Sequence, residues 1–116
     1  MDWPRLLAAH SGRESFVMRL LDIAMGTQAD VPARLRAAAE AGKMDDLVFV
    51  AHGLKGVAGS LQADAVQQLA GRTVELARAG DAQAIALAME LADQAEVVLA
   101  EIRSRIDDYR ARGGIS

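Results

Sequence analysis

Residues 45–65 read DDLVFVAHGLKGVAGSLQADA, and this stretch predicts the architecture of the chain. Apolar and small residues recur in it at alternating steps of four and three, the spacing that places side chains on one face of an α-helix. They are Leu47, Ala51, Leu54, Ala58, Leu61 and Ala65. We expect a helix that Asp45 or Asp46 caps and that packs inward on this stripe. A break near residues 62–64 would let Asp64 cap the next helix.

The flanking sequence predicts further helices rather than strands. It is rich in alanine, with 24 in the chain, and only 3% of residues are aromatic, a balance that favours helices over sheets. Pro4 and Pro32 lie where helices start, because first-turn amides have no partner within the helix. Before the helix of residues 45–65 we expect helices at about 3–10, at 13–26 with an interruption at Gly26 or Thr27, and at 29–41 ending at Gly42. After it we expect a helix from 64 to Gly80 and one at about 82–110 with Asp81 as its cap.

These helices predict an all-α fold in a single domain over residues 1–116. Segments at about 29–110 have the lengths and short connections of an antiparallel four-helix bundle. Extra short helices at about 3–26 would pack against it or cover one end. We expect the tail, residues 111–116, to be frayed.

Composition excludes several classes of function. The chain has 116 residues, a net charge of −3, no cysteine and two histidines. One small domain leaves no room for a multidomain enzyme, and the scattered basic residues argue against nucleic acid. The absence of cysteine removes thiol chemistry, and two histidines are too few for a metal cluster. No apolar run could span a bilayer and no signal peptide is evident, so we expect a cytoplasmic protein without membrane insertion.

His52 is the exception to the helix pattern. At about 100° per residue it points away from the apolar stripe, and Val48, Lys55, Gly56 and Gly59 share its face. A glycine inside a helix costs roughly 1 kcal/mol relative to alanine, so two beside one histidine require a reason. They would leave the imidazole open to a macromolecule, and Lys55 would offset negative charge arriving there.

Two less specific interpretations stand beside this one. The histidine could be an ordinary solvated residue, and Gly56 and Gly59 could be points where two helices come close together. His10, near the end of the first short helix, has no organised neighbours and is expected to be a surface or C-terminal capping residue.

Residues 51–61, AHGLKGVAGSL, resemble the signature of histidine-containing phosphotransfer (HPt) domains, which carry phosphoryl groups in two-component phosphorelays. The resemblance extends upstream over residues 35–42 and 47–50, and downstream over Leu69, Glu75 and residues 78–81. It implies an HPt-like helical bundle.

The resemblance also implies roles for single residues. His52 would be the phosphorylated nucleophile, Lys55 the positive residue near the phosphoryl group, and Gly56 the small residue that keeps the ring accessible. Two positions depart from the pattern: Gln62 stands where glycine is common, and Val74 where a polar residue often bonds toward the imidazole. Gln62 or Glu75 could supply that polar contact instead.

The partners implied are response-regulator receiver domains, whose aspartate would exchange the phosphoryl group with the histidine and whose site would hold Mg²⁺. The chain itself shows no nucleotide-binding signature and is expected to be a monomeric carrier without a bound cofactor, possessing no ATP site of its own. It could stand alone or belong to a hybrid sensor histidine kinase. Expected docking residues are Met44, Val48, Val57 and Gly59, with Arg72 and Arg78 as candidate rim charges.

Two rival functions remain open at this stage. The histidine-bearing domain of a chemotaxis-type kinase has a similar segment but receives its phosphoryl group from an ATP-binding domain. A helical module that only binds partners and is never phosphorylated would keep its binding after loss of His52.

Overall fold

The computed structural model describes residues 1–114, and within them it contains helices and no strand. This confirms the prediction of an all-α fold. None of these helices is long and apolar enough to cross a membrane. The six helices are α1 (Trp3–Ala9), α2 (Glu14–Gln28), α3 (Val31–Ala41), α4 (Met44–Ser60), α5 (Asp64–Arg78) and α6 (Gln83–Ala111).

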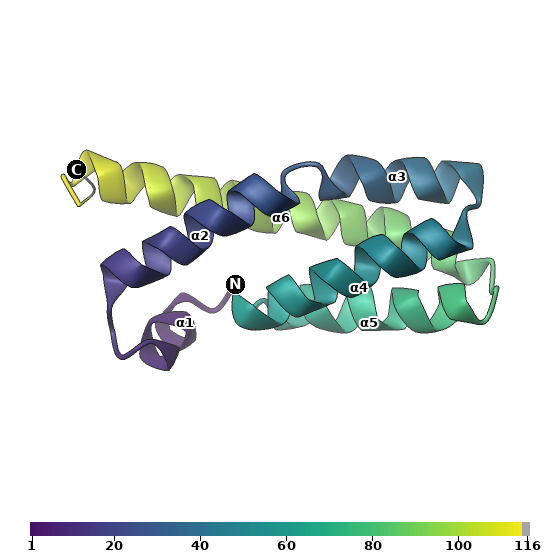
Figure 1. The fold of residues 1–116 in the computed structure, drawn as a ribbon, viewed down its shortest axis with the longest axis horizontal. Coiled ribbons are helices and arrows are strands. Elements are labelled where there is room, and N and C mark those ends of the chain that lie inside the picture. The colour runs from purple at the N-terminus through teal and green to yellow at the C-terminus, as the bar shows by residue number, and fades with distance from the viewer. Residues whose placement is uncertain (115–116) are drawn as a thin grey trace.

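Helices α3 to α6 form the predicted antiparallel four-helix bundle (Figure 1). Helix α4 packs most extensively on α5, and α3 packs on α6. Small alanines at the contacts let the helix backbones approach closely, while leucines fill the space between them. Fully buried members of this core are Leu35, Leu47, Ala51, Ala70, Ala84, Ala88, Leu91 and Ala92.

The N-terminal helices cover the remaining part of α6. Helix α2 lies along the C-terminal half of α6, and α1 packs below it (Figure 1). A second apolar cluster holds them there, built from Leu6, Val17, Met18, Leu21, Ala24, Leu61, Ile102, Ile106 and Tyr109. Helix α2 is not short, and the expected interruption at Gly26 or Thr27 is wrong because the helix continues to Gln28. The glycine penalty of about 1 kcal/mol is smaller than the gain from packing α2 on α6.

Helix α4 begins two or three residues earlier than expected. Lys43 precedes it, and Asp45 and Asp46 lie in its first turn, where carboxylates interact favourably with the positive end of the helix dipole. The prediction of an aspartate cap is therefore wrong. Gly42 ends α3 with a φ of 66°, as expected of glycine in the left-handed region. The side chain of Asp81 accepts a hydrogen bond from Gln83 N at 2.9 Å, but the N-cap residue of α6 is Ala82, so the predicted cap is wrong by one residue.

The apolar stripe of α4 ends earlier than its spacing suggests. The five residues from Leu47 to Leu61 in the stripe are buried, but Ala65 is exposed and Ala63 is buried in its place. The chain turns at Gln62, which has a φ of 57°, so the helical phase is lost there. Asp64 does not cap α5 with its side chain and instead pairs with Arg5.

The expectation of a frayed tail is wrong for residues 111–114. The last turn of α6 closes with a hydrogen bond from Gly114 N to Tyr109 O at 2.9 Å. Arg112 donates to Glu14 at 3.3 Å, which ties this end to the start of α2. Residues 115–116 lie outside the described part of the chain.

Candidate functional site

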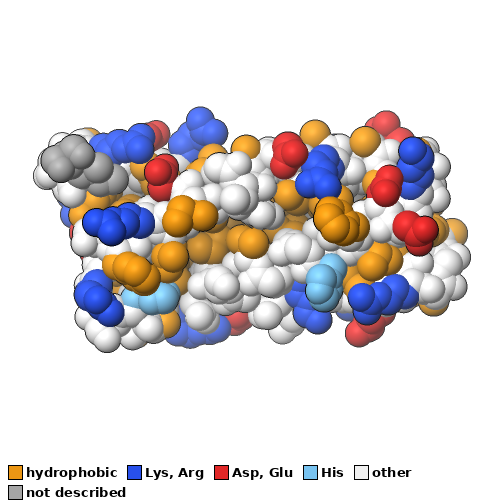
Figure 2. All heavy atoms as spheres, in the orientation of Figure 1, with side chains coloured by type: hydrophobic (Ala, Val, Ile, Leu, Met, Phe, Trp, Pro, Cys, Tyr) orange, Lys and Arg blue, Asp and Glu red, His pale blue; other side chains and the backbone are white. Residues whose placement is uncertain are grey.

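His52 lies in the middle of α4 with its side chain exposed. It faces outward because Ala51 and Leu54, its neighbours on the helix, face the bundle core. Among residues 1–114 the imidazole makes no hydrogen bond and no ion pair, so both ring nitrogens are free of protein partners. Figure 2 shows the two histidines on one side of the molecule, and the right-hand one has hydrophobic and basic side chains around it.

One flank of His52 is open. Gly53 and Gly56 are exposed, and a Cβ built on either would meet no atom of another described segment within 4 Å. Neither glycine is therefore needed for close packing of two helices. The openness gives a second molecule room to approach the ring.

The other flank is closed by α5. Lys55 lies against Gly71, with its Cε 3.6 Å from the position of a Cβ on that glycine. Gly59 lies under Gln67, whose Nε2 would be 2.6 Å from a Cβ on Gly59. Gly59 is thus a helix contact rather than a docking position, and the alternative interpretation holds for it but not for Gly56.

A hollow of about 500 Å³ surrounds the open flank of His52. It runs over α4 from the junction of α2 and α3 to the end of α5. Its lining includes Arg34 of α3, Arg78 of α5, and Val48, Phe49 and His52 of α4. The hollow is large enough to receive side chains of another protein, but it is too open to enclose a small ligand.

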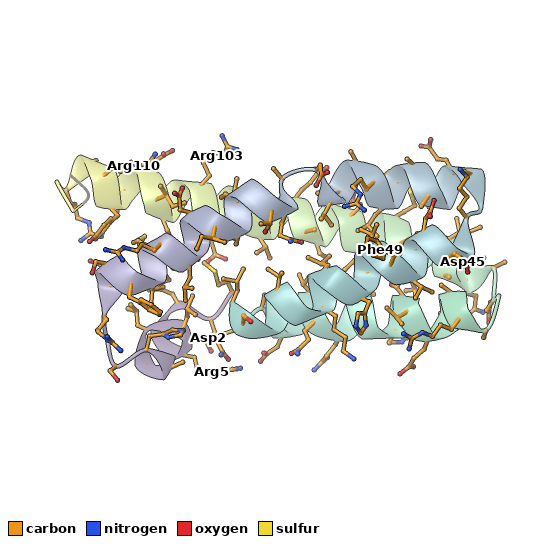
Figure 3. The ribbon with its side chains drawn as sticks, viewed as in Figure 1. Asp2, Arg5, Asp45, Phe49, Arg103 and Arg110 are labelled. Atoms are coloured by element: carbon orange, nitrogen blue, oxygen red, sulfur yellow. The ribbon has the colours of Figure 1, made fainter. Side chains whose placement is uncertain are left out.

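Phe49 is the residue of this site that the sequence analysis missed. It is 73% exposed, in a chain with only four aromatic residues. Figure 3 shows it on α4 at the side facing α3, where the Arg34 guanidinium lies 5.9 Å from the ring centroid. Its position three residues before His52, which puts both on one helix face, was the available signal.

The four expected docking residues lie in three different surroundings. Val48 is half-buried and lines the hollow with His52. Met44 is also half-buried and packs on the bundle core, outside that lining. Val57 packs on the N-terminal cluster and lines an internal apolar cavity of about 20 Å³. The expectation of docking is therefore wrong for Val57 and Gly59, because both face neighbouring helices. Of the two rim candidates, Arg78 lines the hollow and Arg72 does not.

The polar contact expected from Gln62 is not made. Its side chain accepts a hydrogen bond from Arg5 Nε at 2.9 Å, and its backbone carbonyl accepts one from Asp2 N at 3.0 Å. Gln62 thus joins α1 to the turn after α4, and its positive φ gives the physical reason why glycine suits this position. Val74 is buried in the bundle core, whereas Glu75 is exposed. Neither of them bonds to His52.

The same turn carries the clearest electrostatic feature of the molecule. Arg5 Nη1 donates to Asp64 Oδ2 at 2.7 Å (Figure 3 labels Arg5 and Asp2). The hydrogen bond from Arg5 lowers the pKa of the Asp64 carboxyl below its ordinary value, with the charge of Arg5 acting in the same direction. This pair lies at the end of the bundle where α1 meets the turn after α4, and it does not contact His52.

His10 occupies the C-cap of α1, and its ring centroid lies 5.2 Å from that of Phe16. This agrees with the prediction of a capping residue. The described residues contain no group of three or more His, Asp or Glu side chains placed to hold a metal ion.

Fold and site together define a helical bundle that presents one open histidine to a macromolecular partner. The family model described as Hpt domain matches residues 19–112, and the chain belongs to this family. Hpt domains are phosphocarriers rather than enzymes, and they act in histidine phosphotransfer with receiver domains of two-component phosphorelays. No curated protein and no solved structure shows significant similarity to the chain. The family match leaves out α1 and the first five residues of α2.

Proposed function

We propose that His52 carries the phosphoryl group, accepting it from a receiver-domain aspartate and passing it to a second receiver. The observation that supports this assignment is the exposed imidazole on α4 beside Gly53 and Gly56, which leave its flank open. His10 is the only other histidine, and it packs against Phe16 at the end of α1.

The transfer requires little from the carrier beyond position. The imidazole nitrogen without a proton attacks the phosphorus of the aspartyl phosphate, in line with the bond that breaks. An N–P bond forms, the P–O bond to the aspartate breaks, and the carboxylate leaves with the electron pair. The return step runs the same exchange toward the aspartate of the second receiver. Mg²⁺ would be bound by the receiver, where it neutralises charge on the phosphoryl oxygens.

Lys55 stabilises the charge of the phosphorylated histidine in this proposal. It follows His52 by three residues, which places the two side chains on adjacent turns of α4. An ammonium group there attracts the phosphoryl oxygens without forming a fixed bond. Gly56, one turn from His52 on the open flank, keeps room for the receiver.

The remaining parts of the proposal concern the context of the chain. We propose that it forms one domain and acts as a monomeric cytoplasmic module that depends on its partners for phosphorylation. It would function either alone or as part of a hybrid sensor histidine kinase.

Intact-mass analysis tests the proposal. The wild type and the variants His52→Gln and His10→Gln are incubated with receiver domains that have been phosphorylated in the presence of Mg²⁺. We expect an acid-labile adduct of one phosphoryl group in the wild type and in His10→Gln, and none in His52→Gln.

Two other outcomes would replace this function. An adduct formed only with a kinase catalytic domain and ATP would indicate the chemotaxis-type substrate domain. Receiver binding that persists in His52→Gln, without an adduct in the wild type, would indicate a module that only binds partners.

A further inference from the structure

Phe49 is an exposed aromatic side chain beside the candidate phosphorylation site. It is 73% exposed, whereas Phe16, the other phenylalanine, is 40% exposed. Burying an exposed aromatic side chain at an interface removes apolar surface from water, which favours association. An exposed aromatic next to a site that must receive a macromolecule is therefore a candidate contact for that macromolecule.

The geometry around His52 determines from which side a partner can reach it. On the α5 side, Lys55 lies across Gly71 and Gln67 lies across Gly59, so that flank is filled. On the opposite flank Gly53 and Gly56 are uncovered. A partner that approaches the imidazole over these glycines also covers the surface between α4 and α3.

Phe49 lies between two hollows on this surface. It lines the hollow that contains His52 and also a second hollow of about 320 Å³ between α3 and the start of α4. Arg34 lines both hollows as well, and its guanidinium lies 5.9 Å from the Phe49 ring centroid. This cation–π contact favours one orientation of the ring before any partner arrives.

The charge of the hollow fits a partner that presents a phosphorylated aspartate. Arg34 and Arg78 line it, and neither forms an ion pair with any residue from 1 to 114. Asp45 is the one carboxylate among the lining residues. Since the aspartyl phosphate carries negative charge on its phosphoryl oxygens, this excess of positive charge attracts the partner and orients it.

We infer that Phe49 and Arg34 form the anchor on which the receiver domain docks over the α3–α4 side of His52. The inference rests on the proposed function and adds the direction of approach. The partner surface that it requires has an apolar side chain to cover the Phe49 ring and an acidic group near Arg34, both next to its phosphorylated aspartate.

Two phosphodonors separate docking from chemistry. Phosphoramidate is a small donor that reaches His52 without docking, whereas a phosphorylated receiver domain has to dock. For Phe49→Ala we expect the wild-type rate with phosphoramidate. At low receiver concentration we expect about a tenfold slower transfer, which is more than truncation of most interface residues causes. For Arg34→Gln we expect a smaller loss that disappears as salt is raised.

The chain contains a matched control. Arg13 lies 5.5 Å from the ring centroid of Phe16, which makes the same type of pair at the other end of the molecule. Phe16→Ala and Arg13→Gln should leave transfer from the receiver unchanged. Circular dichroism of all four variants verifies that they keep their helices.

The outcomes are distinguishable. Receiver transfer in Phe49→Ala equal to that of the wild type would overturn the inference and leave the proposed function intact. Equal losses in Phe49→Ala and Phe16→Ala would overturn it as well. If the wild type accepts phosphoryl groups from neither donor, the proposed function fails and the inference fails with it.

Discussion

Lys55 of α4 lies across Gly71 of α5, so that a Cβ on Gly71 would be 3.6 Å from Lys55 Cε and 3.8 Å from Lys55 Nζ. The absence of a side chain at Gly71 gives the lysine stem a flat surface, and the ammonium group stays at the seam between the two helices. A methyl group there would make ordinary van der Waals contact, whereas a larger side chain would displace the lysine.

The first prediction concerns the charge of Lys55. Lys55→Ala should shorten the lifetime of the phosphohistidine or slow its formation by about two- to fivefold, a modest effect because the pair is exposed to solvent. Intact-mass time courses measure both quantities. Lys43, the only other lysine, is exposed and lies before α4, so Lys43→Ala is the control. Equal effects of the two substitutions would show that Lys55 has no specific role.

The second prediction concerns access to His52. Gly56→Leu should block transfer from a receiver while the helix remains folded, because leucine is the better helix former by up to about 1 kcal/mol. Gly26→Leu provides the control, since Gly26 is also exposed within a helix and a Cβ there meets nothing within 4 Å. Normal transfer in Gly56→Leu, with both variants folded, would contradict the role assigned to the open flank.

Much of the fold could be predicted because it is encoded locally. Three local features show this: the steps of four and three residues between apolar side chains in α4, the left-handed Gly42, and the hydrogen bond from Gln83 N to Asp81. Each depends on residues that are close in sequence. Ala65 was misplaced because the left-handed turn at Gln62 shifts the helical phase, and a periodic pattern contains no sign of such a shift.

The site was less predictable because it depends on contacts between distant segments. Gly56 and Gly59 lie on the same face of α4, and only the position of Gln67 on α5 separates an open glycine from a packed one. Val57 was similarly expected at the surface, but α2 and α6 cover it. Phe49 was missed because an apolar residue in a helix is usually buried, and its exposure depends on how α3 packs against α4.

The third prediction concerns stability at low pH. Since Arg5 lowers the pKa of Asp64 in the folded state, the pair stabilises the fold above the ordinary pKa of aspartate. This stabilisation is lost as the pH falls through the lowered pKa of the folded state. Between neutral pH and about pH 2, the unfolding midpoint should therefore fall less in Asp64→Asn than in the wild type. The exposed Asp107→Asn is the control, and an identical profile in both variants would contradict the prediction.

The fourth prediction concerns the strained turn at Gln62. A non-glycine residue in the left-handed region costs about 1 kcal/mol, so Gln62→Gly relieves strain but also removes the acceptor for Arg5. In an Arg5→Ala background, Gln62→Gly should raise the free energy of unfolding by about 1 kcal/mol. In the wild type the gain should be smaller. Urea unfolding of the four proteins measures the difference, and equal gains in both backgrounds would show that the bond from Arg5 contributes nothing.

The length of α6 determines how the molecule opens. At 29 residues it is about 43 Å long, and the longest extent of the molecule is 47 Å. Its first half lies in the bundle core, and its second half is covered mainly by α2, on which α1 packs (Figure 1). If the N-terminal helices detach, the end of α6 and the last turn of α4 with Val57 lose their cover. The part of α4 that bears His52 keeps its packing on α3, α5 and α6. We therefore expect amide hydrogens to exchange in two steps, with the segment that bears His52 in the slower one.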